Sequence, residues 1–409
     1  MLNEEEHHLI WMSGQSWDGV AGTHRNMATA LTRYARILWV DPPVSPVTSA
    51  AGWPRIKRSI KPTLTAVNNQ ITRLTPMVLP GFTRPIVRET TSVLVLRQAR
   101  RAMRMLGIQP FAVVDAYVGN YLGHWGDDVV NVLYGTDDYV AGATLMGVSA
   151  RNLRQRELRS LAQADVVAVI TPQLAQRWTD LGASPIVIPN GCWPNRGHNN
   201  SAPPELQDLT PPVVGLVGQL SDRIDLDVLH AIADGGFTLL LVGPVDQRCE
   251  QSSRFRELVA RPNVRFVGRV PADEVPSYLA AIDVGITPYR DTSFNRASFP
   301  LKTLEYLAAG IPTVSADLPA ARWLHADLLK QQPDTPAEDV LALARSNDEY
   351  LSAVSHMAAV QRCKERDAIA SVRHSSAWDK TNSCIEFASR HSWPLRAEMF
   401  ASAIGLLSQ

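Results

Sequence analysis

Two successive series of short apolar segments, each alternating with amphipathic helical segments, restrict the fold of this chain more than any other feature. The first series lies within residues 8–189 and the second within residues 213–316. Short β-rich runs that alternate with helices are typical of parallel sheets, because a parallel connection needs a crossover. The sequence therefore predicts an α/β protein with two Rossmann-like, doubly wound domains.

The expected strands can be placed by residue number. Those of the first series are 8–13, 36–40, 111–116, 129–134, 165–170 and 185–189. Those of the second series are 213–218, 238–243, 264–268, 284–288 and 312–316. Residues 336–390 are expected to be mainly helical.

A polar segment rich in Pro and Asn, residues 193–212, separates the two series and is typical of a linker. A length of 409 residues also suits two domains. We expect an N-terminal domain over residues 1–208 and a C-terminal domain over residues 209–391. A Trp-Pro break starts a final helix, which we place at residues 392–409.

Charge and cysteine content exclude several classes of protein. Forty Lys and Arg residues balance forty Asp and Glu residues, so the chain is no polycation and we expect no nucleic-acid partner. Four scattered cysteines form no C-x-x-C pair, which argues against zinc ribbons and disulfide frameworks. An acidic N-terminus and the absence of an 18-residue apolar stretch favour a cytoplasmic protein.

Doubly wound sheets bind ligands outside the carboxyl ends of their strands. Two such domains are expected to face each other across a cleft that holds the ligand. This narrows the function to a cleft enzyme or a hinged binding protein, and it does not choose between them.

The segment SFPLKTLEYLAAGIPTVS, residues 298–315, carries the most specific pattern. Pro300 suits a first helical turn and Gly310 suits the residue just past a helix end. Lys302 and Glu305 then share one helix face at i and i+3. The residues alone leave open whether these two side chains form a surface ion pair or bind a ligand.

This segment, after the strand VGITP, resembles the nucleotide-binding signature of GT-B glycosyltransferases. It is most similar to family-4-like bacterial enzymes that build capsular, teichuronic-acid-type and lipid-linked surface glycans. The resemblance implies that Glu305 accepts hydrogen bonds from the ribose of a nucleotide sugar and that Lys302 helps to bind the diphosphate. Many retaining members carry a further glutamate where this chain has Ala297, which leaves Asn295 and Ser298 as neutral substitutes beside the donor sugar.

A second segment, residues 213–233, combines a strand, a glycine turn, a polar loop and a helix. Backbone N–H groups at such a helix start, together with a cation, suit a diphosphate. The family often has an Arg and a Lys here, and this chain has Gln219 and Ile224 at those positions. The resemblance therefore assigns donor binding to Gly218 and Arg223. The alternative for Arg223 is a surface contact with a nearby aspartate.

A glycine-rich turn follows the first strand. Gly14 and Gly22 resemble the loop by which the N-terminal domain approaches the donor phosphate and the acceptor. The W-D-x-V-x-x-x-H-R pattern over residues 17–25 resembles the same stretch in the teichuronic-acid-type enzymes. Such a turn also occurs in doubly wound sheets of other functions.

Two adjacent aspartates, Asp137 and Asp138, follow the strand at residues 129–134. The family has an acidic element here on the acceptor side, and an inverting reaction would need one of the pair as general base. Helix capping is the alternative for these aspartates. His124 is a further acceptor-side candidate, and the alternative is a structural histidine beside Trp125.

These residues together predict a hexosyltransferase that moves sugar from a nucleotide-diphosphate sugar of UDP or GDP type to a glycan or lipid-linked acceptor. No bound metal and no other cofactor is expected, and retention of configuration is favoured over inversion. Two alternatives remain open, namely a nucleotide-sugar epimerase and a GT-B scaffold that binds its ligand without turnover.

A basic segment suggests a membrane partner. Residues 50–114 contain eleven basic residues and a single acidic one, Glu89. Within it, residues 91–107 form a helical pattern with apolar side chains on one side, namely Val93, Leu96, Ala99, Met103 and Leu106. An amphipathic element of this kind suits peripheral docking on the anionic inner leaflet. The alternative is a helix whose apolar stripe packs on the N-terminal sheet.

Overall fold

A computed structural model describes residues 7–45, 61–80, 85–194, 201–370 and 376–407. The chain divides into two units. Unit 1 consists of Met1–Pro189 and Arg396–Gln409, and unit 2 consists of Asn190–Leu395. The unit boundaries therefore lie at 189/190 and 395/396, where the sequence had suggested 208/209 and 391/392.

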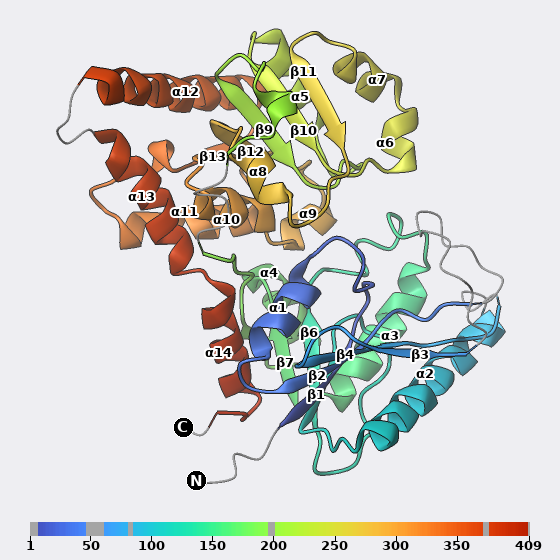
Figure 1. Cartoon of the computed structure of the whole chain (residues 1–409). Helices are drawn as coiled ribbons and strands as arrows, with labels where there is room; N and C mark the ends of the chain where they lie inside the picture. The colour runs from blue at the N-terminus through green and yellow to red at the C-terminus, as the bar shows by residue number, and fades with distance from the viewer. Residues whose placement is uncertain (1–6, 46–60, 81–84, 195–200, 371–375, 408–409) are drawn as a thin grey trace. The chain divides into compact units, whose positions relative to one another are not determined.

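In unit 1, the described residues form one eight-stranded sheet in the order β3-β4-β2-β1-β5-β6-β7-β8 (Figure 1). Its strands are β1 (His8–Met12), β2 (Arg36–Val40), β3 (Thr63–Ala66), β4 (Ile71–Thr75), β5 (Ala112–Asp115), β6 (Val130–Gly135), β7 (Val166–Val169) and β8 (Ile186–Val187). All neighbouring strands are parallel except β3, which is antiparallel to β4. The sequence analysis did not predict β3 and β4, because polar and apolar residues alternate within both strands and neither contains a continuous apolar run.

The helices of unit 1 cover both faces of this sheet. They are α1 (Thr23–Leu31), α2 (Pro85–Leu106), α3 (Ala150–Gln163), α4 (Pro172–Thr179) and the C-terminal part of α14 (Trp393–Ala403). Side chains of α2, α3 and α4 share one apolar core with one face of the sheet. On the other face, Phe400 of α14 packs against Trp11 and Tyr134, with ring centroids 6.0 and 5.3 Å apart. The end of the chain thus returns to the sheet in which it began.

The amphipathic pattern of α2 serves the core of unit 1. Val95, Ala99 and Ala102 are buried against the sheet, whereas Val93 is 54% exposed. Of the stripe expected to face a membrane, Leu96 is also buried and Leu106 is 40% exposed, so the stripe is divided between the core and the surface. This helix has apolar residues on more than one side, so its sequence did not identify the buried side. In the described part of the chain, no helix is both long and apolar enough to cross a bilayer.

In the described part of unit 2, six parallel strands form a sheet in the order β11-β10-β9-β12-β13-β14. The strands are β9 (Val213–Val217), β10 (Thr238–Val242), β11 (Val264–Gly268), β12 (Val284–Thr287), β13 (Thr313–Ala316) and β14 (Leu341–Ala344). Counted along the chain this is the Rossmann order 3-2-1-4-5-6. The strands stay parallel, but the order in which the chain adds them reverses between β9 and β12, and we call this point the strand reversal. The crevice at that reversal, outside the carboxyl ends of the strands, is where such sheets bind ligands.

Residues Leu341–Ala344 form strand β14, so the prediction of a mainly helical region was wrong for these residues. Its sequence, Leu-Ala-Leu-Ala, favours a helix on intrinsic propensity. Parallel pairing with β13 and burial of Leu341, Ala342 and Ala344 override that preference.

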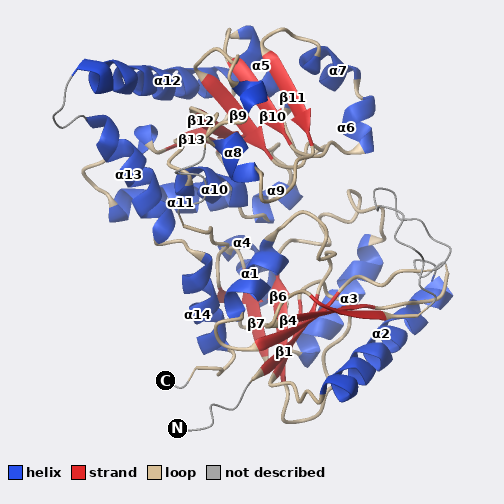
Figure 2. Ribbon diagram, viewed as in Figure 1, coloured by secondary structure: helices blue, strands red, loops and turns tan. Residues whose placement is uncertain are grey.

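Helices flank this sheet on both faces (Figure 2). They are α5 (Leu226–Asp234), α6 (Gln247–Gln251), α7 (Ser253–Val259), α8 (Val275–Leu279), α9 (Ser293–Ala297), α10 (Leu301–Ala308), α11 (Pro319–Gln331), α12 (Asn347–Ala370) and α13 (Ser376–Ser389), with short 3-10 helices at Pro204–Leu206 and Ala337–Asp339. Side chains of α5, α7 and α12 share the core of one face. Those of α8 and α10 share the core of the other face.

The two stretches at which the chain passes between the units lie side by side within unit 2. Cys192 donates its N–H to the carbonyl of His391 at 2.9 Å, and Trp393 donates its N–H to the carbonyl of Cys192 at 2.9 Å. A Cβ on Gly191 would lie 2.8 Å from the backbone nitrogen of Trp393, so only glycine permits this approach. Gly191 therefore serves close backbone packing.

Candidate functional site

Three glycines end the adjacent strands β9, β10 and β11. Gly218, Gly243 and Gly268 have φ angles of 150°, 139° and 80°, a region that favours glycine. Gly218 donates to the carbonyl of Val242 at 2.8 Å, and Gly243 donates to the carbonyl of Gly268 at 2.7 Å. A Cβ on Gly243 would lie 1.9 Å from the carbonyl oxygen of Gly218. The carboxyl edge of the sheet is therefore bare backbone beside the strand reversal.

Tyr306 fastens helix α10 to this edge. Its hydroxyl accepts a 2.7 Å hydrogen bond from the N–H of Val217, the last residue of β9. A Cβ on Gly285 of β12 would meet the Tyr306 ring at 2.6 Å, so the ring lies directly on that strand. Burial raises the pKa of the Tyr306 hydroxyl, which stays protonated. The orientation of α10 against the reversal point is thereby fixed.

Lys302 and Glu305 project from the first two turns of α10. The Lys302 Nζ lies 3.1 Å from the Glu305 Oε2, and both side chains are about one fifth exposed. A Cβ on Gly218 would lie 2.8 Å from the Lys302 Cε, so the lysine side chain passes over the glycine end of β9. The structure thus brings together Gly218, Lys302 and Glu305. A carboxylate offers two acceptors to a vicinal diol, and an ammonium group suits phosphate.

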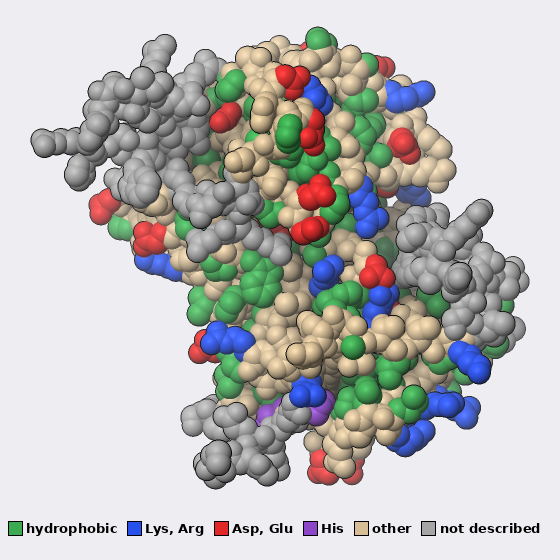
Figure 3. Space-filling model, viewed as in Figure 1, with side chains coloured by type: hydrophobic (Ala, Val, Ile, Leu, Met, Phe, Trp, Pro, Cys, Tyr) green, Lys and Arg blue, Asp and Glu red, His purple; other side chains and the backbone are tan. Residues whose placement is uncertain are grey.

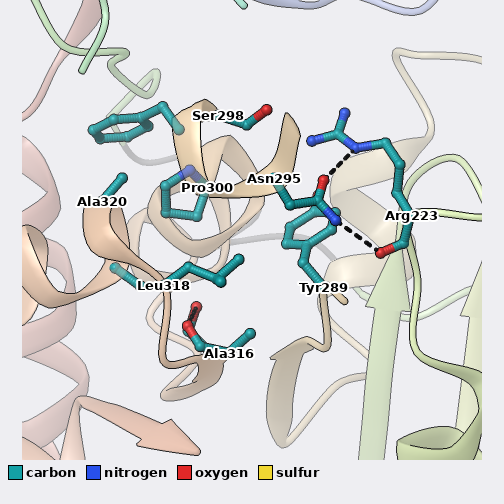
Figure 4. Close-up of a pocket in the computed structure, with 11 residues that line it drawn as sticks. Arg223, Tyr289, Asn295, Ser298, Pro300, Ala316, Leu318 and Ala320 are labelled. Atoms are coloured by element: carbon teal, nitrogen blue, oxygen red, sulfur yellow. Dashed lines mark hydrogen bonds between the residues drawn. The ribbon is translucent and has the colours of Figure 1, made fainter. Parts of the chain in front are cut away.

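Arg223 lies within the loop that joins β9 to α5. Its Nε donates to the Asn295 Oδ1 at 2.8 Å, and the Asn295 Nδ2 donates to the Arg223 carbonyl at 3.2 Å (Figure 4). The guanidinium also lies over the rings of Tyr289 and Phe294, at 5.2 and 4.7 Å. Among the described residues, no carboxylate lies within ion-pair distance of Arg223. Its charge is therefore held in place by neutral groups.

Neither Asp225 nor Asp227 forms an ion pair with Arg223. The Asp225 carboxylate caps α5 by accepting the N–H of Asp227, and Asp227 pairs with Arg254. The Asp225 carboxylate therefore occupies one N–H group at the start of α5. Ile224, at the position of the missing cation, is buried in the core.

A shallow pocket extends from Arg223 to the start of α10. Ser298 and Pro300 line it together with Tyr289 and Asn295. Asn295 is only 2% exposed, and its amide binds the Arg223 and Arg290 carbonyls, so it positions Arg223. Ser298 donates to the Phe294 carbonyl at 3.0 Å.

Ala297 is buried at the end of the short helix α9. This is the position at which many retaining relatives carry a glutamate. The exposed neighbour Arg296 pairs with Asp291 at 2.5 Å.

The glycines after β1 permit tight packing in unit 1. A Cβ on Gly14 would lie 2.5 Å from the Tyr117 ring, and one on Gly22 would lie 3.0 Å from the side chain of Gln15. Gly22 also precedes α1 with an extended backbone and no side-chain cap.

The loop that contains these glycines is tied to the neighbouring strands by charged groups. Arg73 of β4 binds Asp41 at 2.5 Å and Asp18 at 2.6 Å. Asp41 also accepts hydrogen bonds from the Trp17 N–H and the Trp39 indole, each at 2.9 Å. Most of the W-D-x-V-x-x-x-H-R pattern therefore stabilises the loop.

His24, in the same pattern, is a buried neutral histidine. Its Nδ1 lies 3.1 Å from the Ser13 hydroxyl, and its Nε2 lies 2.8 Å from the Thr136 hydroxyl. The Ser13 hydroxyl donates its proton to the Gln15 carbonyl at 2.7 Å, so its oxygen accepts the hydrogen bond from His24. His24 therefore carries its proton on Nδ1. Burial lowers the pKa of His24 to about 3. The ring therefore joins the ends of β1 and β6 without charge.

The two aspartates after β6 differ in their surroundings. Asp138 is 7% exposed, accepts the Ala141 N–H at 2.9 Å and lies 3.3 Å from the Arg177 Nε. It caps a turn and not a helix, since the next described helix, α3, begins at Ala150. Asp137 is only half-buried. His124 is exposed in the loop after β5.

Within the described ranges, no group of three or more His, Cys, Asp or Glu side chains is placed to hold a metal ion. The sequence analysis also missed two parts of this site. The sequence patterns do not indicate a role for Tyr306, and they identify Gly243 and Gly268 only as strand ends. The repeated Val-Gly at the end of β9, β10 and β11 is the signal that could have found the glycine edge.

Comparison with known proteins agrees with this geometry. Residues 211–352 match the family described as "Glycosyl transferases group 1". A protein of Bacillus subtilis (strain 168) named as a teichuronic acid biosynthesis glycosyltransferase, TuaH, is 39% identical over 110 residues. That alignment spans 26% of this chain and 27% of TuaH, so it covers only about a quarter of either protein.

Two solved structures share the fold over nearly the whole chain. Sucrose-phosphate synthase from Thermosynechococcus elongatus superposes with a TM-score of 0.67 at 15% identity, covering 97% of this chain and 98% of that one. Anabaena HepE in complex with UDP superposes with a TM-score of 0.61 at 15% identity, covering 98% and 100%. The chain therefore has the GT-B fold, and residues 211–352 of its unit 2 are similar to the glycosyl transferases group 1 family.

Proposed function

We propose that this protein is a glycosyltransferase that takes sugar from a nucleotide-diphosphate sugar. The observation that carries the proposal is the cluster of Gly218, Lys302 and Glu305 at the strand reversal of unit 2. All three residues lie within the segment that matches the glycosyl transferases group 1 family.

Each group in this cluster has a task in donor binding. Glu305 accepts hydrogen bonds from the ribose diol, since it presents two carboxylate oxygens at a half-buried position. Lys302 and Arg223 neutralise the diphosphate, whose charge grows as the glycosidic bond breaks. Arg223 suits this task because no described carboxylate competes for its charge.

The donor is of UDP or GDP type, and the reaction needs neither a resident cofactor nor a metal ion. HepE, a neighbour in fold, was solved with UDP. Two cations at the donor site supply the charge that a metal ion would otherwise provide.

The acceptor is a glycan or a lipid-linked sugar, and the sequence similarity to TuaH supports a role in surface-polysaccharide synthesis. Retention of configuration is favoured, because retention by front-face attack needs no enzymic base. Asp138, one of the two candidate bases, is committed to Arg177 and to the Ala141 N–H. Inversion would then depend on Asp137.

The protein also docks reversibly on the anionic cytoplasmic leaflet through α2. Arg97, Arg101 and Arg104 are exposed, and Figure 3 shows Lys and Arg side chains gathered over α2. Each basic residue near such a surface contributes about 1 kcal/mol. Arg100 is excluded from this group because it donates to the His124 carbonyl and lies over the Trp125 ring. Arg55, Lys57, Arg58 and Arg84 of the basic segment lie outside the described residues.

Vesicle co-sedimentation tests the docking. Binding should need anionic lipid, weaken with salt and fall in Arg97/Arg101/Arg104→Ser. The control is Arg248/Arg256/Arg269→Ser, which removes three exposed arginines of unit 2. Equal binding to neutral and anionic vesicles would exclude the docking.

Release of nucleoside diphosphate tests the transferase activity. UDP- and GDP-sugars are incubated with the protein, with and without a lipid extract. We expect release that depends on the acceptor and that is lost in Glu305→Gln. Isomerised sugar without an acceptor would indicate an epimerase, and binding without either reaction would indicate a scaffold.

A further inference from the structure

A second pocket lies in unit 1 and is lined almost entirely by polar groups. Side chains from α2, the β5–β6 loop and α3 surround it: Ser92, Asn120, Asn152, Gln155, Arg156 and Arg159. The four from α3 are spaced at i, i+3, i+4 and i+7, so they form one stripe of the helix. Both helices belong to the same face of the unit 1 sheet (Figure 1). We refer to this hollow as the α3 pocket.

Among the residues that the structure describes, the cations of the α3 pocket have no carboxylate partner. In the parts of the chain that the structure describes, neither Arg156 nor Arg159 lies within ion-pair distance of a carboxylate. Glu157, the acidic residue between them, is buried and pairs with Arg177 at 2.7 Å. Burial raises the pKa of Tyr117 and of Tyr121, and the nearby charge of Arg156 opposes that rise.

The loop that forms one wall is held in a strained conformation. Val118 and Asn120 have φ angles of 49° and 62°, which a β-branched residue such as valine adopts rarely. The buried Asp115 carboxylate holds them there by accepting the N–H groups of Tyr117 and Gly119 at 3.1 and 2.9 Å. Strain of this kind persists where the surroundings over-determine it, and it gathers at binding sites.

We propose that the α3 pocket binds the phosphate group of a phosphorylated sugar or lipid. Two guanidinium groups bind phosphate oxygens through paired N–H donors, and the amide and hydroxyl side chains suit the sugar hydroxyls beside it. In the proposed reaction this ligand is the acceptor, and that assignment alone rests on the proposed function. The binding of phosphate itself does not.

Calorimetric titration of the full chain tests the pocket. The probes are inorganic phosphate, glucose 6-phosphate, glucose and monomeric dihexanoyl phosphatidic acid. We expect glucose 6-phosphate or the short lipid to bind and glucose not to bind, with the better of the two identifying a soluble or a lipid-linked source. Arg156/Arg159→Gln should weaken that binding at least tenfold, whereas Arg151→Gln, an exposed arginine elsewhere on α3, should not.

The titration is repeated with saturating UDP and with saturating GDP, because the cations of unit 2 could also attract phosphate. Retained binding places the phosphate in the α3 pocket, and displacement by the nucleotide would overturn the proposal. If neither nucleotide binds, the donor assignment fails while the pocket result still stands. If the double variant does not fold, the single variant Arg159→Gln replaces it, because Arg159 is exposed and its substitution should not disturb the fold. Unchanged affinity in a folded variant would refute the pocket.

Discussion

The hydroxyl of Tyr306 accepts a hydrogen bond from the backbone N–H of Val217, where β9 and β12 separate. The ladder between these strands involves only Val284 and Gly285 of β12, so Val217 lies beyond it. A buried N–H without an acceptor is costly, and here a side chain from α10 supplies the acceptor. One bond thus satisfies the sheet and sets the position of the helix that bears Lys302 and Glu305.

Tyr306→Phe should destabilise the fold by about 1–3 kcal/mol, the cost of leaving a buried N–H unpaired. Urea unfolding measures this change. Tyr278→Phe is the matched control, because Tyr278 donates to an exposed carboxylate, Glu205, which water can solvate instead. A loss no greater than that of the control would refute the anchoring role of Tyr306.

Glu305→Gln should weaken nucleotide binding by about 1.5–3 kcal/mol, because a neutral amide replaces a charged acceptor. The fold should persist, since the side chain is partly exposed. Titration with UDP and GDP gives the affinity. Glu338→Gln, an exposed glutamate of unit 2, should leave it unchanged. Equal affinities of the wild type and Glu305→Gln would remove Glu305 from the donor site.

Asp137→Asn and Asp138→Asn should have different effects. Asp138→Asn should lower stability by roughly 1–3 kcal/mol, because Arg177 loses a charged partner. If the reaction inverts configuration, Asp137→Asn should cost about 10²–10⁴ in turnover with donor affinity intact. Unfolding curves and steady-state rates separate the two effects. A change below tenfold in Asp137→Asn would support retention.

The buried His24 should make stability depend on pH. Its pKa is about 3 in the folded protein and about 6.5 in the unfolded chain. Below pH 6.5 the unfolded state therefore binds a proton that the native state does not, and stability falls as the pH falls. The loss is about 1.4 kcal/mol per pH unit, or about 2 kcal/mol between pH 6.5 and pH 5.

Urea unfolding at pH 7.5, 6.5 and 5 checks this dependence in the wild type and in His24→Gln. The variant should be less stable at pH 7.5 and should lose less stability on acidification. His124→Gln, which changes an exposed histidine, should keep the wild-type slope. Parallel slopes in the wild type and His24→Gln would show that His24 does not carry the effect.

The sequence predicted most of the two sheets, because a buried parallel strand is a continuous apolar run that can be recognised locally. It missed β3 and β4, which are polar, and β14, whose residues favour a helix. The Lys302–Glu305 pair could be predicted because both residues lie on one helix. The Arg223–Asn295 contact joins residues 72 positions apart, and the burial of Asp138 against Arg177 depends on packing, so neither could be predicted from local spacing.

The glycine edge of unit 2 has a consequence for engineering a different donor preference. Gly243 cannot accept any side chain, because its Cβ would overlap the Gly218 carbonyl, and a side chain at Gly218 would displace Lys302. A mutagenesis library aimed at these strand ends would contain mostly non-functional members. Useful diversity is confined to the side chains of the loop after β9 that are neither buried nor assigned to donor binding, namely Gln219, Ser221 and Asp222.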